Sequence, residues 1–431
     1  MSLSLRVPMA RVIAVAVVIS AAIPSTAAAQ AVAIVGGTVF PVSGPKIERG
    51  TVLFRDGRIV AVGANVPVPA GATTIDATGK WVTPGFVNAG TSVGVVEVDA
   101  VEETVDQTAV GDHAIAASFS MIDGLNPASP MIAQARAGGV TSAVLVPGGH
   151  LVYGQAAFID LVAGPATALV VKAPAAMVAQ ITSAERAQLG ARGEVIDRLR
   201  GLFDDVRLYM RRPADYDRGD LHRLSAAPRE LAALVPVLQG REPLLVVANR
   251  ASDIENAVRL GHDYGIKIII AGGAEAWQLA PALVAAHVPV LTGALDNAPQ
   301  SFSTLGQRQD NAARLRRAGV QVVIVGNSDT EDEGAFNARN IGQDAGTAVA
   351  YGLPWDDALR AITLAPAEVF GVADRVGSLA VGREANIVVW TGDPFELSTR
   401  AEHVYVRGHE YSEPLREDLL TQRYKTLPPK Y

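Results

Sequence analysis

From Pro84 onwards, short and nearly continuous apolar runs alternate with helical stretches, and this alternation limits the folds open to the chain. The runs are TSAVLVPG (141–148), TALVVKAP (167–174), PLLVVANR (243–250), KIIIAGG (267–273), VPVLTG (288–293) and VQVVIVGN (320–327). Such runs are typical of parallel strands buried on both faces of a sheet. PGFVNAG (84–90) adds a seventh strand, and VYGQAAFIDL (152–161) is the candidate eighth. The pattern predicts an α/β fold, a distorted (β/α)8 TIM barrel.

Two stretches have the periodicity of helices that lie against such a barrel. In EVIDRLRGLFDDVRLY (194–209), one apolar stripe recurs at helical spacing through Val195, Leu199, Leu202, Val206 and Tyr209. A second helix is predicted over PWDDALRAITLAPAEVFG (354–371).

The two ends of the mature chain have a different texture, that of short strands. Residues 31–80 contain strand-like runs divided by turn signals, and Arg55–Arg58 predicts a hairpin. Strands return at NIVVWTGD (386–393) and HVYVRGHEY (403–411). We expect both ends to build one small composite β-sandwich. The predicted units are 30–82 and 376–412 for the two halves of the sandwich, 83–375 for the barrel and 413–431 for a C-terminal tail.

The first residues resemble an export signal. Two arginines precede the apolar run Val12–Ile23, which is shorter than the roughly 20 residues a spanning helix needs. Small residues at Ala27 and Ala29 then predict a signal peptide, 1–29, cleaved after Ala29. The alternative is an N-terminal membrane anchor. No second long apolar run follows, so the mature chain is expected to be soluble, periplasmic and free of membrane contact.

Charge and cysteine content exclude several functions. The formal net charge is −7, and removing Arg6 and Arg11 with the signal peptide takes it to −9. Such a chain has no electrostatic footprint for nucleic acid. Cysteine is absent, which excludes disulfides, thiolate nucleophiles and cysteine-bound zinc.

Two segments carry a family resemblance. WVTPGFVNAGTSVG (81–94) and AITLAPAEVFGVADRVGSLAVGREANIVVWTGDP (361–394) resemble the start and end of the barrel in the amidohydrolase superfamily, in its imidazolonepropionase-like and dihydroorotase-like branch. The resemblance covers the mature chain. It implies hydrolysis of carbon–nitrogen bonds in amides or cyclic amides, usually with one or two zinc ions that activate water.

The positions at which the family holds its metal carry other residues here. Gly90 and Ser92 stand where the resemblance implies a His-x-His pair, and Gly272 stands at another histidine position. A further histidine position falls at Val247 or Asn249. Four expected histidines are therefore missing, which predicts a subgroup without the usual binuclear zinc site. Asn249 remains a candidate binding residue through its carbonyl oxygen.

Asp329 is the one family ligand position that keeps its acid. The resemblance implies that Asp329 binds metal and acts as general base, while the alternative is a turn residue that caps its loop. His150 follows a barrel strand directly and is a candidate ligand-binding residue at the barrel opening. Lys172 is the one candidate for a bridging carboxylated lysine, and Glu275 for an acid at a helix start; a snorkelling side chain and a helix-end carboxylate are the favoured interpretations.

Two functions from different classes follow. The first is a hydrolase with a rebuilt site that uses Asp329 and a weakly held divalent metal. The second is a catalytically silent barrel that binds a small ligand, or that forms an oligomer with itself or with an intact amidohydrolase paralogue. The acidic clusters at 97–103 and 329–333 suit Mg²⁺ or Ca²⁺ if they face the site, and are solvated loops otherwise.

Overall fold

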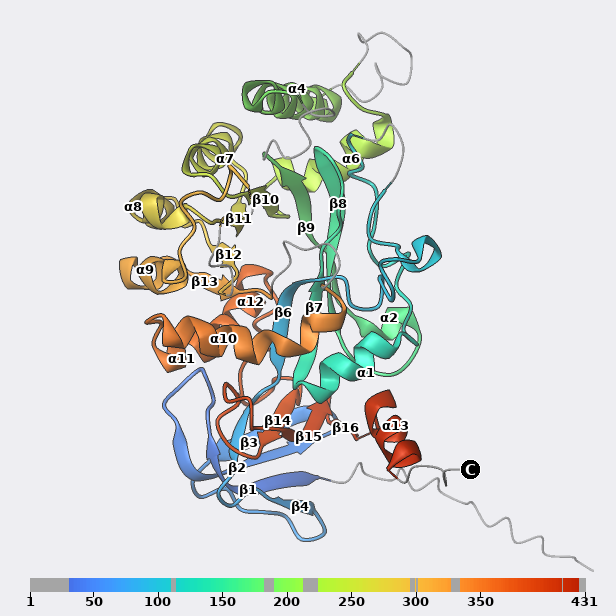
Figure 1. The fold of residues 1–431 in the computed structure, drawn as a ribbon, viewed down its shortest axis with the longest axis vertical. Coiled ribbons are helices and arrows are strands. Elements are labelled where there is room, and N and C mark those ends of the chain that lie inside the picture. The colour runs from blue at the N-terminus through green and yellow to red at the C-terminus, as the bar shows by residue number, and fades with distance from the viewer. Residues whose placement is uncertain are drawn as a thin grey trace, which may run out of the picture.

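The computed structural model describes residues 31–109, 114–181, 190–211, 224–294, 299, 301–326, 334–412 and 414–425. These residues form a nearly closed barrel sheet with helices around it and a second sheet below it in the view of Figure 1. This is the α/β architecture that the apolar runs predict. Among the described residues, no helix has the length and apolar character needed to cross a membrane.

The barrel sheet has eight strands in the order β13-β12-β11-β10-β9-β8-β7-β6. Its end strands, β6 and β13, contact each other without a hydrogen-bonded ladder, so the barrel is nearly closed. The strands are β6 (Phe86–Thr91), β7 (Val140–Leu145), β8 (Val152–Asp160), β9 (Val170–Gln180), β10 (Leu244–Ala248), β11 (Ile268–Gly272), β12 (Val290–Thr292) and β13 (Val322–Ile324).

All eight predicted core strands are present, but the expectation of a wholly parallel sheet is wrong at one of them. β8 runs antiparallel to both β7 and β9. The reason lies in the connection: only residues 146–151 separate β7 from β8. A parallel neighbour needs a crossover of about a dozen residues or more, whereas a short segment returns the chain antiparallel.

Helices cover the outside of this sheet, and α7, α8 and α9 stand in a row along β10–β13 in Figure 1. The predicted stripe lies in α4, where Val195, Leu199, Leu202 and Val206 are buried. The α-helices are α1 (Pro130–Ala137), α2 (Ala166–Leu169), α4 (Arg192–Arg211), α6 (Pro228–Leu238), α7 (Ala251–Tyr264), α8 (Ala280–Ala285), α9 (Asn311–Ala318), α10 (Ile341–Ala350), α11 (Trp355–Ala361), α12 (Leu364–Val369) and α13 (Arg416–Tyr424). Three 3₁₀ turns are η1 (Glu102–Thr104), η2 (Ala276–Leu279) and η3 (Phe336–Asn340).

The helix predicted over 354–371 is two helices, α11 and α12, with Ile362 and Thr363 between them. The second of these helices closes one end of the barrel. Ala365, Ala367 and Phe370 pack into the same core as the inward-facing side chains of the strands. The barrel is therefore open for ligand binding only at the other end, where the parallel strands end at their carboxyl termini.

Both chain ends build the second sheet, as predicted. β5 pairs with β14 and so joins the two halves, and Arg55 pairs with Arg58 across the predicted hairpin. The strands are β1 (Val32–Val39), β2 (Ile47–Arg55), β3 (Arg58–Gly63), β4 (Thr73–Asp76), β5 (Trp81–Pro84), β14 (Ile387–Trp390), β15 (Ala401–Val406) and β16 (His409–Tyr411). The residue boundaries of the predicted units stay predictions.

Charged side chains fix the second sheet to the barrel. The carboxylate of Asp160, at the end of β8, is fully buried and accepts hydrogen bonds from Arg407 Nε at 2.7 Å, Ser142 Oγ at 2.7 Å and Asn386 Nδ2 at 3.0 Å. Arg407 lies in the turn between β15 and β16, so this ion pair sets the position of one sheet against the other.

Candidate functional site

The open end of the barrel holds a cavity of about 520 Å³, here called the mouth. Loops and strand ends from most of the barrel line it: Ala89, Gly90, Thr91, Ser92, Asp99, Val105, Gln107, Thr108, Val146, Pro147, Gly148, Gly149, His150, Tyr153, Leu245, Val247, Ala271, Gly272, Leu291, Val325 and Gly334. Its size suits a small molecule, since ligand pockets run from roughly 300 to 1,000 Å³.

The mouth collects the positions at which the resemblance implies histidines. Gly90, Ser92, Val247 and Gly272 all line it. On β10, Leu245 and Val247 share the inward face because side chains two residues apart on a strand point the same way. The position left open between Val247 and Asn249 is therefore Val247 on the side of the mouth. None of these four residues offers an imidazole or a carboxylate.

The residues that are described do not fit a binuclear zinc centre. Within the described part of the chain, no three histidine, cysteine, aspartate or glutamate side chains come together as a metal site. Zinc sites in proteins take at least three such ligands. The donor set that faces the mouth is made instead of hydroxyl, amide and backbone groups.

The backbone at Gly272 is itself adapted to the absence of a side chain. Gly272 has a φ of +86°, a left-handed conformation that side-chain-bearing residues rarely adopt. A Cβ there would lie 2.3 Å from Asn249 Oδ1. The Asn249 amide thus occupies the space that a histidine at 272 would need.

Asn249 and His150 both lie at this end of the barrel. Asn249 follows β10, and its Oδ1 accepts a hydrogen bond from Ala274 N at 3.4 Å. His150 is partly buried and lines the mouth from the connection between β7 and β8. The two residues are on different walls, and their roles in binding stay predictions.

Several polar residues of the mouth escaped the sequence analysis. Asp99, Gln107 and Thr108 reach it from the long segment between β6 and α1, and Tyr153 from β8. Gln107 Nε2 donates to Val146 O at 3.1 Å, which holds this segment over the mouth. No periodicity marks such a segment, so only a spacing of polar residues in a long loop could have drawn attention to it.

Asp329 and the acidic cluster 329–333 fall outside the described residues, as does His113. The chain leaves β13 through Val325, which lines the mouth. Of the other acidic cluster, Asp99 faces the mouth, while Glu102 and Glu103 are exposed on η1.

Lys172 and Glu275 have structural partners. Lys172 Nζ donates to Phe370 O at 2.8 Å, beside the helix that closes the far end of the barrel, and burial lowers the pKa of this lysine. It cannot bridge metals at the mouth. The Glu275 carboxylate accepts from Ala251 N at 2.8 Å and Gly306 N at 3.0 Å. It therefore caps the first turn of α7, in line with the helix-end interpretation.

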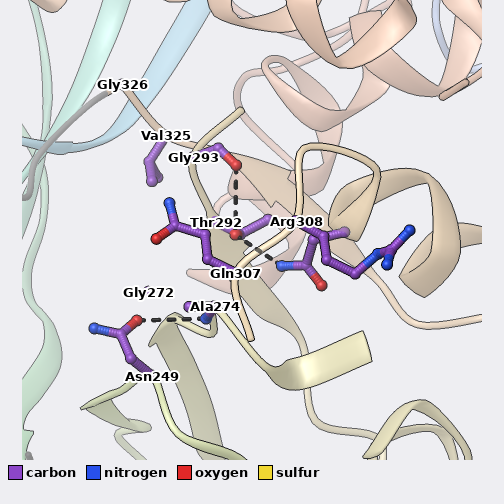
Figure 2. Close-up of a pocket in the computed structure, with 10 residues that line it drawn as sticks. Asn249, Gly272, Ala274, Thr292, Gly293, Gln307, Arg308, Val325 and Gly326 are labelled. Atoms are coloured by element: carbon purple, nitrogen blue, oxygen red, sulfur yellow. Dashed lines mark hydrogen bonds between the residues drawn. The ribbon is translucent and has the colours of Figure 1, made fainter. Parts of the chain in front are cut away.

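A smaller cavity of about 30 Å³, here called the amide sub-pocket, lies beside the mouth. Figure 2 shows its walls at the ends of β10–β13. The lining residues are Asn249, Gly272, Ala274, Thr292, Gly293, Gln307, Arg308, Asn311, Val325 and Gly326. Gly272 and Val325 line both cavities, so the two are adjacent.

Comparison with known families and proteins places these features in context. The amidohydrolase family model matches residues 247–410. The chain is 26% identical over 392 residues to amidohydrolase tasK of Hapsidospora irregularis, covering 83% of this chain and 39% of that protein. It is 23% identical over 389 residues to imidazolonepropionase of Mesorhizobium japonicum, covering 84% of this chain and 90% of that enzyme.

Solved structures agree with the fold. An amidohydrolase from Thermotoga maritima matches with a TM-score of 0.80 and 29% identity, covering 89% of this chain and all of that one. Molinate hydrolase matches with a TM-score of 0.53 at 20% identity, which shows the fold alone.

Proposed function

Because this chain belongs to the amidohydrolase superfamily, we propose that it binds a small amide-containing molecule in its barrel mouth without the usual binuclear zinc centre. The observation that carries this proposal is the shared position of Gly90, Ser92, Val247 and Gly272 around one cavity. A glycine, a serine, a valine and a glycine leave room for a ligand while supplying no metal ligands of the kind that zinc prefers.

Hydrolysis of a carbon–nitrogen bond is the second candidate function. Its support comes from the relatives, which are named amidohydrolase and imidazolonepropionase. In this form of the proposal, Asp329 takes a proton from water and passes it to the leaving amine, aided by a weakly held divalent metal. The chain spans 39% of the length of tasK, so pairing with an intact amidohydrolase partner, or with a second copy, is part of the silent-barrel form.

We also propose that the protein acts after export to the periplasm. The support is the basic start, the apolar run and the small residues before Gln30. The intact mass of exported protein should lack residues 1–29. A mass that retains Met1 contradicts the assignment.

The central test is ligand binding and turnover by the mature chain. Neutral amides and cyclic imides are titrated by calorimetry, and the same compounds are followed chromatographically for hydrolysis. We expect saturable binding that Gly90→Leu abolishes, because the new side chain enters the mouth. Gly193→Leu is the matched control, since Gly193 lies on α4 with no atom within 4 Å of a Cβ placed there.

The two candidates separate on turnover. Binding without turnover supports the silent barrel. Turnover that a chelator stops supports the hydrolase with a metal. If no compound binds and none is hydrolysed, the mouth is not a site for amides and the proposal fails.

A further inference from the structure

The amide sub-pocket presents uncharged side-chain groups only. Its polar side chains are the amides of Asn249, Gln307 and Asn311 and the hydroxyl of Thr292, with Arg308 at one wall. Figure 2 shows the Arg308 guanidinium directed away from the sub-pocket. That group binds the Asp310 carboxylate through Nε at 2.7 Å and Nη2 at 3.0 Å, so its charge is already compensated.

Two carbonyl oxygens in the sub-pocket accept no hydrogen bond. The Asn311 side chain is buried with 3% of the residue exposed, and its Nδ2 donates to Gly273 O at 3.0 Å and Thr292 Oγ1 at 3.2 Å. Its Oδ1 has no donor among the described residues, and neither has the buried Oε1 of Gln307. Buried acceptors normally have a partner, because leaving one unsatisfied costs about 1–3 kcal/mol.

The size of the sub-pocket limits what supplies the missing donors. Its volume of about 30 Å³ exceeds the roughly 10–15 Å³ that a single water needs. It is far too small for a whole ligand, but it opens beside the mouth. The end group of a molecule that lies in the mouth can therefore enter it.

The charges limit the chemistry of that end group. No carboxylate lines the sub-pocket, so an ammonium group or a metal cation would lose its hydration without a counter-charge. An anion would face two carbonyl oxygens. The group that matches both oxygens is a neutral N–H donor.

We propose that the amide sub-pocket binds the N–H edge of an uncharged amide, urea or cyclic amide, whose hydrogens are donated to Gln307 Oε1 and Asn311 Oδ1. This inference rests on the proposed function and narrows its ligand class to neutral molecules that carry N–H groups. The rest of such a molecule lies in the mouth, past Gly272 and Val325.

The test compares probe pairs that differ only in their N–H groups. Acetamide is compared with N,N-dimethylacetamide, and 2-imidazolidinone with its 1,3-dimethyl derivative, by ligand-observed NMR on the mature chain. We expect the N–H forms to bind at least about tenfold more tightly, since each hydrogen bond to a buried group contributes roughly 0.5–1.5 kcal/mol. Equal binding within each pair would overturn the inference.

Variants assign any preference to the sub-pocket. Gln307→Leu should abolish it, while Gln278→Leu, at an exposed position after Glu275, should retain it. Gln307→Glu is a second route if the leucine variant unfolds: the new carboxylate should shift preference from acetamide toward protonated ethylamine. A preference that survives both Gln307 variants contradicts the assignment.

Failure of this inference can be told from failure of the proposed function. If both members of each pair bind equally and Gly90→Leu abolishes binding of both, the mouth is a ligand site but the sub-pocket does not read N–H groups. If no probe binds in any form, both statements fail. A crystal structure with 2-imidazolidinone in the mouth and a water on both oxygens also overturns the inference.

Discussion

Asn249 Oδ1 lies where a Cβ of Gly272 would have to be, with 2.3 Å between that oxygen and an ideally placed Cβ. The two residues follow or end neighbouring strands, β10 and β11, at the barrel mouth. Their fit means that the loss of a histidine at 272 is more than a single replacement. The local backbone and the adjoining side chain have both taken a form that excludes one.

Restoring that histidine should therefore damage the fold, whereas restoring another should not. Gly272→His meets a left-handed backbone at φ +86°, which costs about 1–2 kcal/mol, and also clashes with Asn249. Gly90→His meets only Val325 at 3.4–3.5 Å from its Cβ. We expect thermal unfolding to show a clear loss of stability for Gly272→His and a small change for Gly90→His. Equal stability of both variants would show that the contact at Asn249 is not restrictive.

A buried carboxylate at the closed end of the barrel predicts an unusual pH dependence. Glu242 is 4% exposed, and neither of its carboxylate oxygens has a partner among the described residues. Burial raises its pKa from the ordinary 4.5 to about 7, although the nearby Lys172 and Arg241 favour the charged form. Between these two pH values the folded chain keeps a proton that the unfolded chain has released. The stability contributed by Glu242 therefore falls as pH rises through this window.

Glu242→Gln removes this titration. At pH 8 the variant should be more stable than the parent by on the order of 1–3 kcal/mol, and at pH 4.5 the difference should be much smaller. Unfolding by urea at the two pH values measures it. Glu255→Gln, at an exposed position on α7, is the matched control and should show neither effect. A Glu242→Gln variant that is less stable at pH 8 contradicts the interpretation.

The ion pair between the barrel and the second sheet should be essential for stability. Arg407→Met leaves the fully buried Asp160 carboxylate without its cation, and breaking such a pair costs about 3–5 kcal/mol. Burial already raises the pKa of Asp160 to about 6, and loss of the guanidinium raises it further. The variant should therefore lose less stability at pH 5, where Asp160 takes up a proton, than at pH 8. Arg55→Met, at the exposed hairpin, serves as the control; matching losses would refute the buried-pair account.

The strands of this fold could be predicted because their apolar runs are local and continuous, and all eight core strands of the barrel were found this way. The reversed direction of β8 could not, because direction depends on which neighbours a strand pairs with. The short connection 146–151 is the feature that decides it. Likewise, the break between α11 and α12 at Thr363 is invisible to a pattern that stays apolar across it.

The site was predictable in part for the same reason. A family resemblance pointed to Gly90, Ser92 and Gly272, and all three line the mouth. The choice between Val247 and Asn249 needed the pleat of β10, which a two-residue uncertainty in register hides. Gln107 and Tyr153 face the mouth because a long segment folds over it, and Gln307 and Asn311 meet across separate connections. Nothing in the sequence around these residues marks that proximity.

Asp329 decides whether any hydrolysis found belongs to this barrel. If Asp329 is the general base, Asp329→Asn should lower the turnover rate by on the order of 10²–10⁴ and leave ligand affinity little changed. In the silent barrel it should change stability by about 1 kcal/mol and affect nothing else. Activity on the amide panel and thermal unfolding are measured on the same preparation. Turnover unaffected by Asp329→Asn would leave the hydrolase without its nominated base.

Metal content is the most direct measurement of the account's central claim, that the mouth has lost the binuclear zinc centre. The mature protein is purified, dialysed mildly and analysed for metals beside the double variant Gly90→His, Ser92→His. We expect well under one zinc per chain in the parent. The double variant should not gain a tight site, because Val247 and Gly272 still leave zinc short of the three or more ligands it needs. Two tightly held zinc ions per parent chain would contradict the account.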